Sequence, residues 1–217
     1  MFKKLAYSMH REEKGITGLE TAIILIAFVV VASVFAYTAL SAGLFSTQKS
    51  QEAIYSGLEE TRSTLEMKGA IVAKAETTGA DGYLSQLTFT LANALGGEAI
   101  DFTVPTSDVT TGLAASGSNN VVVVSYIDKD QRVEDLYWTV SKLGDADSDD
   151  LLEANEKFQI TIGNAVAGEG GGNLVNALEP NLTVNKSFTI QIKTPKGAVM
   201  TFERTTPAVI DSVMSLN

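Results

Sequence analysis

The sequence predicts an α+β protein, in which a long N-terminal hydrophobic α-helix precedes an antiparallel β-sandwich head domain of immunoglobulin-like type. Three features predict it: an uncharged apolar run over residues 22–40, a helix-periodic stretch over residues 46–67, and alternation of apolar and polar residues beyond Gly69. The sequence has no cysteine and one histidine, His10, which excludes thiol chemistry and leaves little for a histidine-dependent site. The formal charge of −10 argues against a nucleic-acid partner.

The apolar run follows a short basic segment, residues 1–15, in which four basic side chains accompany two acidic ones. As a helix, residues 22–40 would be about 28 Å long, close to the hydrocarbon thickness of a bilayer. A secretory signal peptide usually has a shorter apolar region that ends in a small-x-small cleavage site. A helix retained in the membrane, with its N-terminus in the cytoplasm, is therefore favoured.

The residues just before the apolar run, Lys14-Gly15-Ile16 with Glu20 beyond them, resemble the processing site of type IV pilin-like proteins. The resemblance implies that a membrane prepilin-type peptidase cuts after Gly15 and that the helix is retained from Ile16. The new α-amine would share a helix face with Glu20, and it would offset the cost of about 2.5–3.5 kcal/mol for a carboxylate in lipid. Thr17 and Glu20 also have the spacing of a capping box, and Glu20 can serve in turn as part of a helix cap and as the amine partner.

The apolar run continues into an amphipathic stretch. Ala53, Ile54, Leu58 and Leu65 recur at helix-like intervals among charged residues, which predicts a helix that emerges into water and ends near Gly69. We therefore divide the chain into a cleaved leader over residues 1–15, a long helix over residues 16–69 and a β-sandwich over residues 70–217.

Beyond Gly69 the alternation is typical of strands with one buried and one solvated face. Glycine-, asparagine- and proline-containing turns separate the alternating segments. About eight short strands in a single domain indicate an immunoglobulin-like sandwich. The expected strands cover residues 70–75, 83–91, 98–104, 121–128, 135–143, 157–162, 186–193 and 198–204.

The densest acidic segment, residues 144–156, has the ligand spacing of a calcium-binding EF-hand loop. The expected Ca²⁺ ligands are Asp145, Asp147, Asp149, the carbonyl of Leu151, Glu153 and Glu156. Asp150 departs from the pattern, because the loop normally has glycine there, and strands rather than helices flank it. Two hypotheses stay open: a calcium loop within a β-domain, and an acidic hairpin without an ion.

Two Asn-x-Ser/Thr sequons begin at Asn181 and Asn185. In an exported protein such sequons are acceptors for N-linked glycans and lie on the surface. If both asparagines were on a strand, they would face the same side, and sugars would cover one patch of the head. Short sequons also arise by chance, so unmodified asparagines are the alternative.

Segments at both ends of the chain resemble archaellins, the archaeal flagellins. They are KGITGLETAIILIAFVVVASVFAY over residues 14–37 and GAVMTFERTTPAVIDSVMSLN over residues 197–217. The resemblance implies a structural subunit of the archaellum filament, a homopolymer for swimming motility with the long helices in its core and the heads outside. Its implied partners are a prearchaellin peptidase, an assembly platform and a motor ATPase, with a membrane-inserted precursor before assembly. Ile16 departs from the family, which often has Gln or Ala there.

Two other functions remain open. An adhesive type IV-like pilin would share the leader and the helix but present a ligand-binding head, and a membrane-anchored surface protein would stay uncleaved and monomeric. No set of catalytic residues emerges from the sequence, so we expect no enzymatic activity.

Overall fold

The computed structural model describes residues 2–62, 64–94, 97–108, 110–163 and 174–216, and side chains from Gly18 onward except those of residues 60 and 62. The chain divides into two compact units, Met1–Tyr55 and Ser56–Asn217. The first unit is helical. The second contains the end of the helix and the β-rich head.

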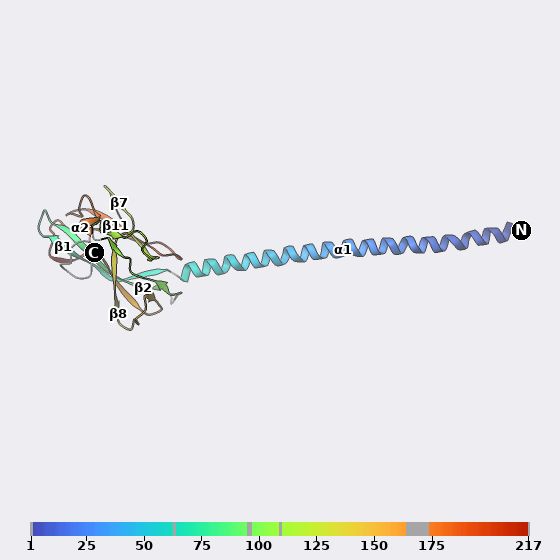
Figure 1. Ribbon diagram of the computed structural model, residues 1–217, viewed down its shortest axis with the longest axis horizontal. Coiled ribbons are helices and arrows are strands. Elements are labelled where there is room, and N and C mark those ends of the chain that lie inside the picture. The colour runs from blue at the N-terminus through green and yellow to red at the C-terminus, as the bar shows by residue number, and fades with distance from the viewer. Residues whose placement is uncertain (1, 63, 95–96, 109, 164–173, 217) are drawn as a thin grey trace. The chain divides into compact units, whose positions relative to one another are not determined.

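Helix α1 covers Phe2–Arg62 without interruption (Figure 1). Its part from Gly18 to Glu59 is long and apolar enough to cross a membrane, as the hydropathy of the sequence predicts. The helix ends earlier than the expected Gly69, because strand β1, Leu65–Thr77, begins within the segment expected to be helical. Leu65 is buried and pairs with Asn93 of the neighbouring strand, so burial in the head decides the conformation of residues 65–69.

The head contains a five-stranded and a four-stranded sheet, whose neighbouring strands are all antiparallel. The larger sheet has the order β13-β1-β2-β10-β8, with β13 Val213–Leu216, β2 Tyr83–Asn93, β10 Lys157–Ile162 and β8 Trp138–Leu143. The smaller sheet has the order β12-β11-β6-β7, with β12 Met200–Thr205, β11 Ser187–Lys193, β6 Val123–Asp128 and β7 Arg132–Val133.

The two sheets share one hydrophobic core. The rings of Phe89 on β2 and Phe202 on β12 meet edge to face at 5.2 Å between centroids, which joins the larger sheet to the smaller one. Trp138, fully buried, packs against Phe102 at 5.8 Å. Apolar residues on one face of each strand therefore meet between the sheets, and the predicted α+β class with a sandwiched head is confirmed.

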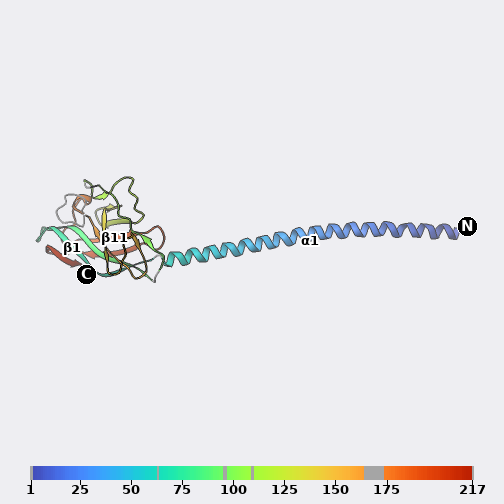
Figure 2. The ribbon, with the colours of Figure 1, turned by 60° about the horizontal axis from the view of Figure 1, so that its bottom comes forward.

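The structure adds elements that the alternation pattern did not predict. The C-terminal strand β13 pairs with β1, and its red ribbon lies beside β1 (Figure 2). The other additions are β7, the strand β9 Leu151–Leu152, which pairs with β3 Ile100–Asp101, the pair β4 Ser107–Asp108 and β5 Leu113–Ala114, and the one-turn helix α2 Leu174–Ala177. The expected strand over residues 98–104 is reduced to β3.

Candidate functional site

The first candidate site is the surface of α1. Apolar runs over residues 23–26 and 29–31 place hydrophobic side chains on every face, since consecutive helical positions point in different directions. From Leu19 to Tyr55 the large apolar side chains are between 52% and 74% exposed within the chain. An apolar surface of this extent needs lipid or other protein around it.

The hydroxyl groups along α1 do not interrupt this surface. Four of them donate a hydrogen bond to a backbone carbonyl one turn earlier in the helix, so their polar hydrogens are satisfied without water. The bonds are Thr21 to Gly18 at 3.0 Å, Ser33 to Val30 at 2.8 Å, Thr38 to Phe35 at 2.9 Å and Thr47 to Leu44 at 2.8 Å. The helix can therefore enter either lipid or a packed bundle of helices without stranding these donors.

The predicted processing site lies within α1. Only the backbone is described there, and the side chains of residues 14–17 are outside the described part of the structure. Because α1 begins at Phe2, Thr17 lies inside a continuous helix, and the capping-box hypothesis is wrong for the uncleaved chain. Glu20 is exposed on the same helix. Its pairing with an α-amine stays a prediction, since that amine exists only after cleavage.

The second candidate is the acidic loop between β8 and β10. Its carboxylates accept hydrogen bonds from backbone amides of the same loop. Glu156, 8% exposed, accepts from the amides of Asp147 at 3.0 Å and Glu153 at 2.9 Å. Asp147 accepts from the amide of Asp149, and Asp149 accepts from the amide of Leu151, both at 2.9 Å.

This geometry does not fit the predicted calcium site. Among the residues that the structure describes, no three acidic or histidine side chains gather closely enough to hold a metal ion. Leu151, the expected carbonyl ligand, lies in β9 opposite Asp101. Asp150 forms an ion pair with Lys142 at 3.1 Å, and its carbonyl accepts the amide of Phe102 at 2.7 Å. Hydrogen bonds thus close the loop, and calcium remains a prediction without geometric support.

The third candidate is the loop before β11, which carries both sequons. Neither asparagine is on a strand: Asn181 is half-buried, and Asn185 is exposed in a turn with φ of 52°. Both asparagines nevertheless line one groove of about 490 Å³. Lys129 and Asp130, from the loop between β6 and β7, also line it. The structure therefore brings the two predicted acceptors to the same concave surface.

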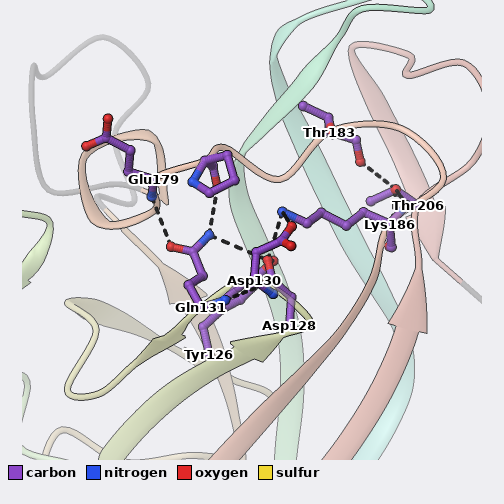
Figure 3. Close-up of polar contacts among 9 residues, drawn as sticks. Tyr126, Asp128, Asp130, Gln131, Glu179, Thr183, Lys186 and Thr206 are labelled. Carbon is purple, nitrogen blue, oxygen red and sulfur yellow. Dashed lines mark hydrogen bonds and ion pairs between the residues drawn. The ribbon is translucent and has the colours of Figure 1, made fainter.

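A buried ion pair lies beneath this loop (Figure 3). Lys186 is only 8% exposed, and its Nζ lies 3.0 Å from Oδ2 of Asp128 and 3.2 Å from Oδ2 of Asp130. The side chain of Asp128 is fully buried. It also accepts the Tyr126 hydroxyl at 2.7 Å and the backbone amides of Asp130 at 2.7 Å and Gln131 at 2.8 Å. Several donors therefore surround the buried carboxylate, as a buried charge requires.

Further hydrogen bonds fix the loop at both ends (Figure 3). Gln131 donates from Nε2 to the carbonyl of Pro180 at 2.6 Å and accepts the amide of Glu179 at 3.0 Å. At the other end, the amide of Lys186 donates to the hydroxyl of Thr206 at 2.9 Å. The sequon loop is therefore held by the β6–β7 hairpin on one side and by the segment after β12 on the other.

The network keeps Asp128 and Lys186 in their charged forms and Tyr126 in its neutral form. Burial alone would raise the pKa of Asp128, but the hydrogen bonds from Tyr126, the Asp130 amide and Lys186 outweigh it and hold that pKa far below its usual range. Burial opposes the charge on Lys186, and the two aspartates outweigh it and raise the pKa of Lys186. Burial, followed by the hydrogen bond to Asp128, raises the pKa of Tyr126.

The sequence analysis missed this network, although the pattern contained a signal for it. In β6, Asp128 lies two and four positions after the inward residues Tyr126 and Val124, so it falls on the same face of the strand. Lys186, just before β11, likewise lies two positions before the inward residue Phe188. Phe188 pairs directly with Asp128 across the strands. Opposite charges at inward positions on the ends of two strands could thus have predicted a buried ion pair.

Comparisons with known proteins agree on one family. Residues 15–204 match the model of the archaeal-type flagellin family. The chain is 37% identical to probable flagellin 1 of Archaeoglobus fulgidus, over 95% of this chain and 96% of the relative, and 30% identical to probable flagellin 1 of Aeropyrum pernix, over 91% and 94%. The structure resembles the archaeal flagellum of Methanospirillum hungatei strain JF1, with a TM-score of 0.60, 29% identity and coverage of 92% and 98%. The chain therefore belongs to the archaeal-type flagellin family.

Proposed function

We propose that this chain is a structural subunit of the archaellum filament, which polymerises through α1 and serves swimming motility. The apolar surface that covers every face of α1 carries this conclusion, because one chain cannot bury it alone. The likeness to subunits of a flagellar filament supports the same role. The chain is a structural component and not an enzyme.

The helix surface suits two successive environments. In the precursor, lipid would cover the apolar residues of α1, and in the filament the helices of neighbouring subunits would cover them. Small side chains along the helix, including Ala27, Ala32 and Ala36, allow helices to approach closely. Transfer from lipid to bundle keeps the apolar surface out of water, so assembly does not have to overcome the full hydrophobic cost of extraction.

Assembly would begin with cleavage after Gly15 by a membrane prearchaellin peptidase. Cleavage would remove the basic segment and create the α-amine of Ile16 as partner for Glu20. An assembly platform and a motor ATPase would supply the energy for extraction and rotation, because the sequence has no phosphate-binding loop motif.

N-terminal sequencing of filaments sheared from cells tests this proposal directly. We expect the exported chain to start at Ile16, and a Gly15→Leu variant to accumulate uncleaved in the membrane without filaments. A matched Gly18→Ala variant, three positions away where a Cβ would meet open space within the chain, should be cleaved normally. Exported chains that begin at Met1 would contradict the proposal.

A deletion strain separates motility from adhesion. We expect loss of filaments in electron micrographs together with loss of swimming. Cells that swim normally but no longer attach to surfaces would instead favour an adhesive type IV-like pilin, and no described feature of the head favours that function at present.

A further inference from the structure

The two sequons differ in how the folded head presents them. In Asn185-Lys186-Ser187 the outer residues are exposed and the middle one is buried. In the Asn181 sequon both the asparagine and Thr183 are half-buried. A sugar chain must remain in water after folding, so only the second sequon offers it an unobstructed exit.

The buried ion pair explains why Asn185 points outward. Asp128 and Asp130 hold Lys186 inside the head (Figure 3), and the residues on either side of it are exposed. Asn185 itself has a left-handed backbone conformation, which asparagine tolerates better than most residues, and its amide donates to the carbonyl of Pro207 at 3.2 Å. The position is therefore fixed as well as exposed.

The surroundings of Asn181 are restrictive. The carbonyl of Pro180, just before it, accepts Nε2 of Gln131 at 2.6 Å, and the carbonyl of Thr183 accepts the hydroxyl of Thr206 at 2.6 Å. Leu182 is fully buried. Hydrogen bonds thus hold the backbone on both sides of the half-buried Asn181, so this segment has less freedom to make room for a bulky group than the exposed Asn185.

We propose that Asn185 is the glycan acceptor of this pair, and that the first sugars of its glycan lie in the adjoining groove against Lys129 and Asp130. The groove, about 490 Å³, is lined by residues that carry polar groups suited to sugar hydroxyls, among them Lys129, Asp130 and Asn181. A sugar that is covalently attached at the rim stays close to the groove, so even weak contacts are enough to hold it there. The inference rests on the proposed function, since it requires export of the head.

Peptide mass mapping of filaments sheared from wild-type cells tests the choice of acceptor. We expect sugar on the peptide that contains Asn185 and none on Asn181. Asn185→Gln and Ser187→Ala should abolish the modification, whereas Asn181→Gln and the sequon-preserving Ser187→Thr should leave it in place. Sugar on Asn181, or no sugar on either asparagine, would overturn the proposal.

A double-mutant comparison tests the groove. Lys129→Ala should lower the melting temperature of the head in glycosylated filaments but leave it unchanged in the Asn185→Gln background, because only the sugar-bearing form makes the contact. Lys157→Ala, on an exposed lysine of the other sheet, serves as the matched control and should behave alike in both backgrounds. An equal shift for Lys129→Ala in both backgrounds would overturn the seating of the sugar.

The outcomes also separate this inference from the proposed function. Asn185→Gln cells that still make filaments and swim, with the sugar lost, support both. Unmodified wild-type filaments from swimming cells overturn the glycan inference and leave the filament role intact. Export as an uncleaved monomer would overturn the filament role, whatever the state of Asn185.

Discussion

At the residue scale, the buried charges of the head are the feature with the largest desolvation cost. Lys186 and Asp128 occupy positions where the strand pattern would place apolar residues, and removal of either charge from water is costly. Their mutual contact, with the Tyr126 hydroxyl and two backbone amides, compensates for that cost. The network is therefore stable only as a complete set.

Replacement of one member of the Lys186–Asp128 ion pair should destabilise the head much more than replacement of both. Lys186→Met leaves Asp128 buried without its cation, and we expect the free energy of unfolding to fall by about 3–5 kcal/mol. Urea denaturation of the full chain in detergent, followed by tryptophan fluorescence, measures the loss. The double variant Lys186→Met/Asp128→Asn should recover part of it. Equal losses for the single and double variants would contradict this account.

Glu134 should contribute an acid-sensitive part of the stability. The hydrogen bond from Lys193 at 2.7 Å, with those from Ser125 and Arg132, lowers the pKa of Glu134 from 4.5 to about 2. A depressed folded-state pKa stabilises the head above the unfolded value, and this contribution is lost as the pH falls from 4.5 toward 2.

In Glu134→Gln, the decline of unfolding free energy over that pH range should be shallower than in the wild type. Glu76→Gln, on an exposed residue of β1, is the control and should keep the wild-type slope. Since Glu134 is 43% exposed, the effect should weaken with added salt. An unchanged slope for Glu134→Gln would show that its interactions do not contribute to the acid sensitivity.

Glu156 decides between the two hypotheses for the acidic loop. Its carboxylate accepts two backbone amides, so Glu156→Gln should lower the free energy of unfolding by about 1–3 kcal/mol. If hydrogen bonds alone hold the loop, the loss is the same in excess chelator and in millimolar calcium. A calcium ion at the predicted ligands would instead make the wild-type melting temperature fall in chelator and would remove most of the difference between the two proteins.

At the element scale, strands with sustained alternation were predictable and short pairings were not. Residues 157–162 form β10 as expected, because its three inward apolar residues, Phe158, Ile160 and Ile162, specify one face. The helix end was placed too late, since local periodicity around Leu65 does not reveal the partner strand that buries it. The sequence did not predict β9, because two residues are too few to show an alternation of apolar and polar side chains. Only the pairing with β3 defines this strand.

The C-terminal strand shows the same dependence on distant partners. Leu216, 3% exposed, pairs with Ile71 of β1, which lies almost the whole head away in sequence. Leu216→Ala should lower the free energy of unfolding by about 2–5 kcal/mol, because it removes buried apolar volume at the end of the sheet. Val213→Ala is the matched control in the same strand, since Val213 is 60% exposed and should cost little. Equal effects of the two substitutions would show that β13 does not seal the core.

The residues of the candidate sites were predictable from the sequence, but their geometry depends on partners that the sequence pattern does not reveal. The two sequons were identified from the sequence, but their difference depends on Lys186, whose burial requires Asp128 from another strand. In the acidic loop, the spacing of carboxylates matched an ion-binding pattern, yet the backbone amides of the same loop take up the oxygens of Asp147, Asp149 and Glu156. Spacing reports which ligands are available, and it does not report competing donors.

At the scale of the whole molecule, the proposed cleavage after Gly15 would leave a chain with two opposite surface chemistries. The leader contains four basic and two acidic residues, so its removal changes the formal charge from −10 to −12. It also removes His10, and the processed chain then has neither histidine nor cysteine. An apolar helix and an acidic head would remain, and we expect the charge of the head to keep it hydrated and so to confine polymerisation to the helix.

Glu20 is the one charged side chain between Ile16 and Gln48, and its placement predicts a role in assembly rather than in folding. After cleavage, its carboxylate can accept a hydrogen bond from the α-amine of Ile16 in the same or a neighbouring subunit. Loss of a hydrogen bond between charged groups costs about 1.5–3 kcal/mol, so Glu20→Gln should reduce incorporation into filaments about tenfold or more.

Quantitative immunoblots of sheared filaments and membranes measure that effect. The Glu20→Gln precursor should still be cleaved, and the mature chain should accumulate in the membrane. Glu52→Gln, in the same helix beyond the apolar run, should assemble at the wild-type level, because Glu52 is solvated and pairs with Lys49. Normal filaments from Glu20→Gln cells would show that the new α-amine needs no carboxylate partner. An uncleaved Glu20→Gln precursor would instead assign Glu20 to recognition by the peptidase.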